Sequence, residues 1–327
     1  MIRLSVVIPI YNAEDFLDEC LRSVERECRS DARIETVMID DGSSDRSAEI
    51  AQRYAEKLPA QMRLIRQANG GQSVATNYGI RMARGDCVGF VDADDWIDPG
   101  MLTGMLDAMI ASDAEMVICD YRKVFADGST KVFRYQQTGT AGLDPHDDPR
   151  LIFGCGYSPW NKVVRKRMFE EHGCYFPEGM IFQDMVAFVR MISRSRKVVN
   201  TGAVAYNYRI REGSLLHSMN PSAYDIFKAL ELLQQTLDRR FEAELEFLAM
   251  KELFYASMPR VVRYGGSDAR RFFERSVTFL EERFPGWRQN RYLKERGWWH
   301  RWYMFGIGKR CYRCVRVLAL LKKIGRY

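Results

Sequence analysis

GDCVGFVDADDW, residues 85–96, combines a short apolar run with three closely spaced carboxylates. Residues 87–91 have the length and composition of a buried strand, and the acids follow where a strand gives way to a loop. Alternation along an extended chain points Asp92 and Asp94 the same way, so both can reach one cation. Mg²⁺ or Mn²⁺ suits such a D-x-D site, because these ions take carboxylates, waters and phosphate oxygens as ligands. The alternative is a solvated acidic turn before a helix.

The chain around this stretch alternates strand and helix patterns. Strands are expected at residues 4–8, 34–39, 62–65, 87–91 and 116–119, and helices at 13–28, 47–58, 72–83 and 101–111. This alternation predicts an α/β fold, a Rossmann-like and mostly parallel sheet flanked by helices. In such a sheet, ligands bind at the carboxyl ends of the strands.

Four polar or glycine-bearing loops each follow a predicted strand, at residues 11–12, 40–43, 69–71 and 92–94. On one edge of one sheet they would line a single cleft. Asp41 could hold a nucleoside base and ribose, and the glycines at 70 and 71 let a backbone approach a ligand closely or simply form a turn. Because no G-x-G-x-x-G follows the first strand and no G-K-S/T occurs, neither a dinucleotide fold nor a P-loop is supported.

Composition is that of an ordinary globular protein, with 46% hydrophobic and 28% charged residues. The first residues lack the apolar core of a signal peptide, and no apolar stretch approaches the roughly 18 residues that span a bilayer. Most of the eight cysteines lie in apolar patterns, and the lone C-x-x-C at Cys311 and Cys314 is a weak zinc or redox signal. We therefore expect a reduced, cytoplasmic protein.

Positive charge is concentrated at the C-terminal end. Residues 286–327 carry twelve Lys/Arg and one acid, a net +11 that leaves −5 for the rest of the +6 chain. Aromatic residues alternate with these cations on a predicted amphipathic helix, which favours binding to an anionic membrane surface. The alternative is a helical subdomain that packs on the body or on a second copy in a homo-oligomer. No nucleic-acid partner is expected, because the body is acidic.

This pattern divides the chain into residues 1–220 as the α/β domain, 221–284 as a helical packing segment and 285–327 as the basic aromatic tail. Within the first part, Asp127-Gly128 lies between two β-like runs and predicts a hairpin. Asp184 could cap a helix at 185–193 or act as an exposed catalytic carboxylate. Arg209, Arg211 and His217 supply positive charge suited to a diphosphate, although each alone is more typical of a solvated surface.

Several motifs taken together resemble family 2 glycosyltransferases of the GT-A fold. They are VVIPIYN at 6–12, DDGSSD at 40–45, NGG at 69–71, DADD at 92–95, and Ala75 with Asn77 and Gly79. The stretches at Trp160-Asn161-Lys162, around Asp184 and at 206–214 are similar to bacterial members that build capsule, exopolysaccharide or lipopolysaccharide. The resemblance covers about two thirds of the chain.

The resemblance implies a nucleotide-sugar donor, usually a UDP-sugar, and inversion at the anomeric carbon. It places Pro9, Tyr11 and Asp41 in a uridine pocket, Asn69 and Gly70 near the donor, Asp92 by the ribose or sugar, Asp94 on the metal, and Asp184 as the base. The departure is Gln183, which stands where the family commonly has Glu. A neutral neighbour would leave Asp184 a weaker base, since it removes like-charge pressure on the pKa of that carboxyl.

We therefore expect an inverting, metal-dependent hexosyl- or N-acetylhexosaminyltransferase. Its acceptor would be a glycan or a lipid-linked hydroxyl, and its location peripheral at the inner face of the cell membrane. Arg209 and the cation would neutralise the departing diphosphate. Because Gln183 is neutral, an alternative hypothesis remains, in which the protein is a non-catalytic nucleotide-sugar scaffold. A sugar-nucleotide pyrophosphorylase is disfavoured, because no glycine- and lysine-rich loop follows the first strand.

Overall fold

A computed structural model describes residues 3–135, 142–210, 221–266, 268–294 and 298–320. Its contacts divide the chain into two compact units, one of residues 1–179 and 183–211, the other of residues 180–182 and 212–327. The domain boundary that we expect at residue 220, together with Arg211 and His217, lies outside the described residues.

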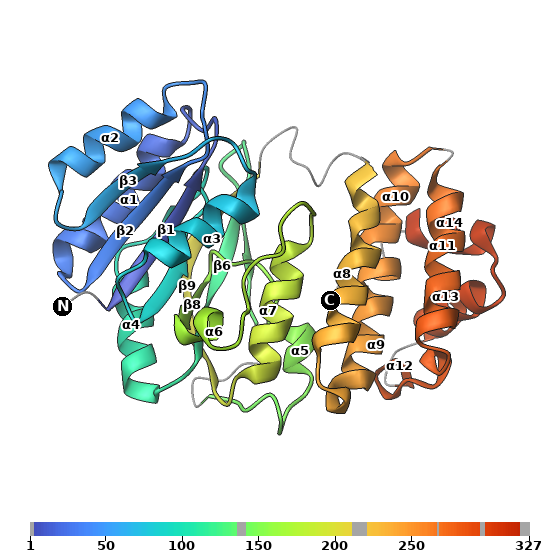
Figure 1. Ribbon diagram of the computed structural model, residues 1–327. Helices are drawn as coiled ribbons and strands as arrows, with labels where there is room; N and C mark the ends of the chain where they lie inside the picture. The colour runs from blue at the N-terminus through green and yellow to red at the C-terminus, as the bar shows by residue number, and fades with distance from the viewer. Residues whose placement is uncertain (1–2, 136–141, 211–220, 267, 295–297, 321–327) are drawn as a thin grey trace. The chain divides into compact units, whose positions relative to one another are not determined.

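The first unit is built on one nine-stranded sheet (Figure 1). Eight of its strands follow the order β3-β2-β1-β4-β8-β6-β9-β5, and the ninth, β7, pairs with β6. Its strands are β1 Leu4–Ile10, β2 Ile34–Asp40, β3 Met62–Arg66, β4 Cys87–Phe90, β5 Trp96–Ile97, β6 Met116–Val124, β7 Thr130–Phe133, β8 Lys162–Arg165 and β9 Val198–Arg209. The structure confirms the α/β fold class, with a sheet that is mixed rather than mostly parallel.

The sheet is parallel at its N-terminal end, where β1 pairs with β2 and β4, and β2 pairs with β3. Beyond β4 it becomes mixed, because β8 runs antiparallel to both β4 and β6, while β6 and β9 are parallel. The carboxyl ends of β1, β2, β3 and β4 therefore meet at one edge. Asp127-Gly128 forms the turn of the predicted hairpin, in which β6 and β7 pair antiparallel.

Helices cover both faces of the sheet. They are α1 Leu17–Ser30, α2 Ser47–Lys57, α3 Gln72–Met82, α4 Met101–Ser112, α5 Leu151–Gly154, α6 Arg167–Glu170 and α7 Gln183–Arg194. Helices α1, α2 and α4 share one apolar core with β1. On the opposite face, α3 packs so closely that a Cβ on Gly79 would lie 2.4 Å from the Val7 side chain, and Phe188 of α7 contacts Phe90 of β4.

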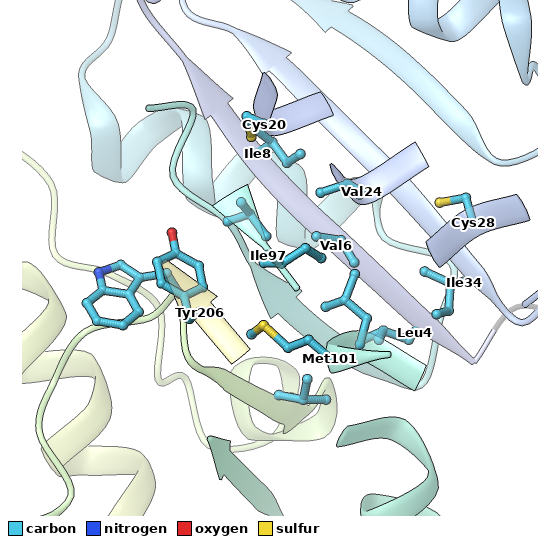
Figure 2. Packing of buried hydrophobic residues seen from close by; sticks show 14 of the residues in the cluster. Leu4, Val6, Ile8, Cys20, Val24, Cys28, Ile34, Ile97, Met101 and Tyr206 are labelled. Carbon is cyan, nitrogen blue, oxygen red and sulfur yellow. The ribbon is translucent and has the colours of Figure 1, made fainter. Parts of the chain in front are cut away.

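Figure 2 shows the larger core, in which Leu4, Val6 and Ile8 of β1 face Cys20 and Val24 of α1. These β1 residues alternate along the strand, and the α1 residues recur at helical spacing, as the sequence predicts. Cys20, Cys28, Cys87, Cys119, Cys155 and Cys174 are buried and free, so most of the cysteines serve packing.

The second unit is helical. It contains α8 Asp225–Thr236, α9 Glu242–Met250, a π-helical segment Lys251–Ser257, α10 Met258–Tyr264, α11 Asp268–Arg283, α12 Arg291–Lys294, α13 Trp298–Gly308 and α14 Tyr312–Leu320 (Figure 1). Tyr303 of α13 is buried, and its hydroxyl donates to the Phe254 carbonyl of the π-helical segment at 2.7 Å. That bond ties the predicted tail to the packing helices.

The described part of the tail is packed rather than free. Ile307, Val315 and Ala319 are buried. Cys311 and Cys314 are joined by a disulfide, which departs from the reduced state that we expect for the cysteines. No helix among the described residues is long and apolar enough to cross a membrane.

Candidate functional site

The loops that follow β1, β2 and β3 are hydrogen-bonded to one another. Asp41 N donates to the Ile10 carbonyl at 2.9 Å, and Gln67 N donates to the Asp40 carbonyl at 2.9 Å. Asn12 N donates to Ser43 Oγ at 3.1 Å. The segments that the sequence places at one edge of the sheet therefore lie together.

Asp41 is a buried carboxylate that holds the glycine loop. The backbone N–H groups of Gly70 and Gly71 donate to its two oxygens at 2.9 and 2.8 Å, and Gln67 Nε2 donates at 2.7 Å. Because a carboxylate with several donors is strongly held, Asp41 fixes the path of the chain from β3 into α3. These hydrogen bonds fix the orientation of the Asp41 carboxylate before any nucleoside binds.

The remaining predicted donor residues lie around this carboxylate. Tyr11 is 55% exposed at the end of β1, and Pro9 is half-buried and pairs with Ile39 of β2. Asn69 is exposed, and its backbone nitrogen would lie 3.0 Å from a Cβ on Gly42, which has a φ of +74°. Only glycine fits that approach without strain.

Asp92, Asp94 and Asp95 converge after β4, with carboxylate oxygens within 4.8 Å of one another. Asp92 and Asp94 are half-buried, whereas Asp95 is 1% exposed. Burial, then the charges of Asp92 and Asp94, raise the pKa of Asp95 to about 9. Oxygen ligands crowded at this spacing fit a hard divalent cation, whose charge would offset the repulsion.

Asp95 is held by partners from β9. Its carboxylate accepts from the Tyr206 hydroxyl at 2.8 Å and from Arg209 N at 2.7 Å. The same hydroxyl accepts from Asp92 N at 3.2 Å. Asp95 and Tyr206 thereby fix the backbone that presents Asp92 and Asp94.

Arg209 lies beside the acids, and its side chain is anchored. Nε donates to the Asp94 carbonyl at 2.9 Å, and the guanidinium pairs with Glu19 at 2.6 Å. The guanidinium carbon lies 4.5 Å from the Trp96 ring centre and 5.1 Å from that of Phe16. The guanidinium that we expect to face a diphosphate is therefore paired with the Glu19 carboxylate in this structure.

Asp184 lies in the first turn of α7, where it accepts from Met185 N at 2.8 Å. Burial raises the pKa of Asp184, and the Met185 N–H and the charge of Lys162 partly offset that effect. The preceding Phe182 has a φ of +67°, a strained conformation for a bulky residue. Burial thus supplies the upward pKa shift that Gln183, being neutral, does not.

Lys162 is a functional candidate to which the sequence gave no role, although it lies in the Trp160-Asn161-Lys162 motif. The side chain is 1% exposed, and Nζ donates to the Ser158 carbonyl at 2.7 Å and to Asn161 Oδ1 at 2.9 Å. Burial lowers the pKa of Lys162 to about 8. Nζ lies 5.1 Å from the ring centre of Phe188, one helical turn beyond Asp184.

Comparison with known proteins identifies the family of this chain. Residues 5–173 match the model of glycosyl transferase family 2. The chain belongs to that family. The uncharacterized glycosyltransferase EpsJ of Bacillus subtilis is 30% identical over 75% of this chain and 69% of its own length. EpsH of the same organism, also a glycosyltransferase by name, is 30% identical over 83% and 80%.

Among solved structures, TarS residues 1–349 of S. aureus in complex with UDP-GlcNAc superposes with a TM-score of 0.80 at 18% identity. The match covers 100% of this chain and 93% of that one. At this identity the likeness shows the fold, and it is the GT-A fold of a family 2 glycosyltransferase. The protein is therefore a glycosyltransferase.

Proposed function

We propose that this family 2 glycosyltransferase moves a sugar, with inversion, from a UDP-sugar to a hydroxyl of a glycan or lipid-linked acceptor in cell-surface polysaccharide synthesis. The observation that carries the proposal is the convergence of Asp92 and Asp94 at the same sheet edge as the Asp41-held glycine loop. Carboxylates at this spacing suit the cation that accompanies a diphosphate, and a loop of glycines lets a nucleotide approach the backbone closely.

Named relatives support the donor and the pathway class. Solved structures of TarS hold UDP-GlcNAc and UDP, and the matching TarS sequence is a poly(ribitol-phosphate) β-N-acetylglucosaminyltransferase. Another relative is the minor teichoic acid biosynthesis protein GgaB of Bacillus subtilis. We accordingly expect a hexosyl or N-acetylhexosaminyl donor.

In the proposed complex, Tyr11, Pro9 and Asp41 surround the uracil and ribose. Tyr11 offers an exposed ring at the end of β1, and aromatic rings are suited to stacking on a base. Asn69 and Gly70 lie along the rest of the nucleotide. Asp92 faces the ribose or sugar.

Asp94, with Asp92, would hold Mg²⁺ or Mn²⁺, since a structure of similar fold, a mannosyltransferase of Pyrobaculum calidifontis, contains Mn²⁺ with GDP-Man (TM-score 0.53, 15% identity). When bound, the ion supplies positive charge that offsets the diphosphate. Arg209 would add to that charge by exchanging Glu19 for a phosphate oxygen.

Asp184 is the proposed base. As the acceptor oxygen bonds to the anomeric carbon, the carbon–oxygen bond to the diphosphate breaks and the hydroxyl proton passes to Asp184. Such proton transfer contributes on the order of a hundred- to ten-thousandfold in rate. Lys162 keeps part of the raised pKa of Asp184 in check, so that the carboxylate form stays available.

The experiment is to measure nucleoside diphosphate release from a panel of nucleotide sugars, with Mn²⁺, with Mg²⁺ and with a chelator. We expect metal-dependent UDP release from one sugar, and its loss in both Asp94→Asn and Asp184→Asn. Asp107→Asn, on the exposed face of α4, is the matched control. Full turnover in a purified, folded Asp94→Asn or Asp184→Asn variant would remove that residue from the mechanism.

A second candidate function is a non-catalytic nucleotide-sugar scaffold, favoured by Gln183 beside Asp184. It predicts donor binding without transfer or slow donor hydrolysis, even when candidate lipid-linked acceptors are present. The same panel separates the two, provided that donor binding is measured alongside release.

We also propose that the enzyme is peripheral at the cytoplasmic face of the cell membrane. Trp302 and Phe305 of α13 are 60% and 58% exposed and contact each other, and Lys309 lies over the Phe305 ring. Arg313 and Arg316 of α14 are exposed as well. Exposed aromatics beside cations are suited to an anionic lipid surface.

A further inference from the structure

An aromatic face runs away from the acidic centre across β9 and Trp160, which stands two residues before β8. Tyr206, which bonds Asp95, stacks on Trp160 with ring centres 4.3 Å apart and planes at 18°. Tyr208 stacks on the same indole at 5.5 Å and 15°. The buried Trp160 thereby holds a half-buried tyrosine ring two residues from the one that contacts the acids.

The face continues onto the β6–β7 hairpin. Tyr121 meets Trp160 edge-on at 4.8 Å, and stacks on Phe133 at 5.0 Å with planes at 7°. Tyr121 and Phe133 are paired in register and half-buried. Rings fixed on a sheet provide a rigid apolar surface at low cost in conformational entropy.

Two lysines end this aromatic face. Lys123 and Lys131 are directly opposite in the β6–β7 register, and their Nζ atoms lie 4.9 and 5.2 Å from the Phe133 ring centre. Lys123 also lies 5.8 Å from the ring of Tyr208. Within the described ranges, neither lysine forms an ion pair with a carboxylate.

Like charges directly opposite on a sheet are unfavourable. Burial and then the charge of Lys131 lower the pKa of Lys123, so an anion placed between the two ammonium groups would offset their repulsion. A bound anion with two charges would relieve both effects.

The lysines are linked to the acidic loop through neighbouring strands of the sheet. Val124, next to Lys123, pairs in register with Arg209, and Lys123 itself pairs with Tyr208. Arg209 in turn donates to the Asp94 carbonyl. One row of the sheet therefore connects the paired cations to the loop that carries Asp94.

We infer that the face formed by Tyr208, Tyr121, Phe133, Lys123 and Lys131 is the acceptor site, and that the acceptor carries a phosphate group held between the two lysines. The inference rests on the proposed transfer function and specifies the acceptor. The rings would lie against the sugar or polyol unit, and the ammonium groups would bind the phosphate through charge-assisted hydrogen bonds. The phosphate could belong to a lipid phosphate or to a polyol phosphate.

The test is binding of small probes to the full chain with UDP and Mn²⁺ present. Glucose 6-phosphate is compared with glucose and glucuronate, in wild type and in the Lys123→Gln/Lys131→Gln double variant. We expect glucose 6-phosphate to bind more tightly than the other two, and to lose about tenfold or more in affinity in the double variant. Lys57→Gln is the matched control, because Lys57 also lies over a ring, that of Tyr54, but pairs with Glu25.

Equal affinity of wild type and double variant for glucose 6-phosphate would overturn the inference. The inference would also be overturned if glucuronate bound wild type as tightly as glucose 6-phosphate does, or if glucose 6-phosphate did not bind up to about 10 mM. Farnesyl phosphate and glycerol 3-phosphate distinguish the sources: lysine-dependent binding of either supports the site, and lysine-independent binding of both contradicts it.

Donor hydrolysis is measured in the same preparations and keeps the two proposals apart. If wild type releases no UDP from any donor but binds glucose 6-phosphate through the lysines, transfer fails and the anion site stands. If UDP release is normal in the double variant and its KM for a phosphate-bearing acceptor is unchanged, the acceptor site fails and transfer stands.

Discussion

At the scale of single residues, carboxylates of one type differ by their surroundings. Asp95 is buried and bonded to Tyr206 and the Arg209 backbone, whereas Asp92 and Asp94 remain half-buried beside it. Asp184 lies in the first turn of α7, where the charge of the buried Lys162 partly offsets the upward shift that burial gives its pKa. Burial and hydrogen bonding therefore suit Asp95 to a supporting role. In the proposed mechanism, Asp92 and Asp94 bind the cation and Asp184 accepts the proton.

Lys162→Met should move the acid limb of the pH–activity profile upward. In the proposed mechanism, activity requires the carboxylate form of Asp184, so activity should fall as pH drops through the pKa of that group. The Lys162 cation favours the carboxylate and lowers the pKa of Asp184, and removing the cation raises it. Methionine keeps the volume of the stem.

The measurement is kcat/KM for transfer between pH 5 and 9, with circular dichroism to confirm the fold. The expected outcome is a limb shifted to higher pH with a plateau close to that of wild type. A limb at the wild-type position would show that Lys162 does not act on the base.

Tyr206→Phe should weaken activation by Mn²⁺ while the stack on Trp160 is kept. The variant removes the hydroxyl that donates to Asp95 and accepts from Asp92 N. Groups that orient metal ligands typically contribute about 10–100-fold in affinity. We expect the Mn²⁺ concentration for half-maximal UDP release to rise about tenfold.

Tyr54→Phe is the control for that variant, since its hydroxyl also bonds an aspartate, Asp18 at 3.0 Å, but on α1. It should leave the Mn²⁺ dependence unchanged. If both tyrosine variants behave alike, the hydroxyl of Tyr206 has no specific role at the acids.

The sequence predicted Asp92 and Asp94 as a pair because alternation after a strand is a local signal. It could not predict that Asp95 is bonded by Tyr206, which is 111 residues away. The burial of Lys162 could not be predicted for a related reason. A lysine is expected to be exposed unless it is paired, and only the contacts of Lys162 with Phe188 and Tyr135 reveal its burial.

At the scale of elements, the loop from β3 to α3 depends on backbone conformation. Gly71 has φ +88° and ψ 166°, and no atom lies within 4 Å of a Cβ placed on it. Gly71→Ala therefore tests strain without a clash. We expect it to lower the free energy of unfolding by about 1–3 kcal/mol and to weaken UDP binding, because Gly71 N donates to Asp41.

Gly104→Ala is the matched substitution, in α4, where a Cβ also meets open space and the backbone is helical. Alanine should stabilise that helix by about 0.5–1 kcal/mol. Urea unfolding and UDP titration of both variants provide the check. A Gly71→Ala protein as stable and as tight-binding as wild type would refute the strained-loop account.

Element types were predictable where periodicity is strong, and the first four expected strands appear as β1 to β4 in the structure. Bounds shifted where tertiary contacts extend an element. β6 reaches Val124 because it pairs with both β7 and β9, whereas the apolar signal ends at Cys119. The antiparallel insertion of β8 between β4 and β6 has no local signal, because pairing partners are set by the whole sheet.

At the scale of the whole molecule, the charge excess of the tail is partly neutralised within the helical unit. Arg288 and Arg310 both pair with Glu281, and Arg291 pairs with Glu244. These pairs agree with the packed-subdomain alternative for the described residues. A membrane role must then come from cations and rings that remain exposed after packing.

The rings and cations that remain exposed in this unit include Trp302, Phe305, Arg313 and Arg316. These residues allow a direct test of the membrane proposal. The wild-type protein should co-sediment with vesicles that contain an anionic lipid more than with neutral ones. Because exposed charges are screened by salt, binding should fall between 50 and 500 mM NaCl. Each basic residue near the surface contributes about 1 kcal/mol.

The variants separate the two contributions. Arg313→Gln/Arg316→Gln should lower binding at low salt by an order of magnitude, and Trp302→Ser/Phe305→Ser should remove the part that persists at high salt. The controls are Arg270→Gln, an exposed α11 residue that pairs with Glu274, and Ile110→Ser, an exposed apolar residue of α4. If the tail variants match their controls, the rings and cations of α13 and α14 face something other than lipid, and a second copy of the chain becomes the partner to examine. That follows because a packed helical unit can expose such residues to lipid or to protein, and only salt-dependent lipid binding distinguishes the two.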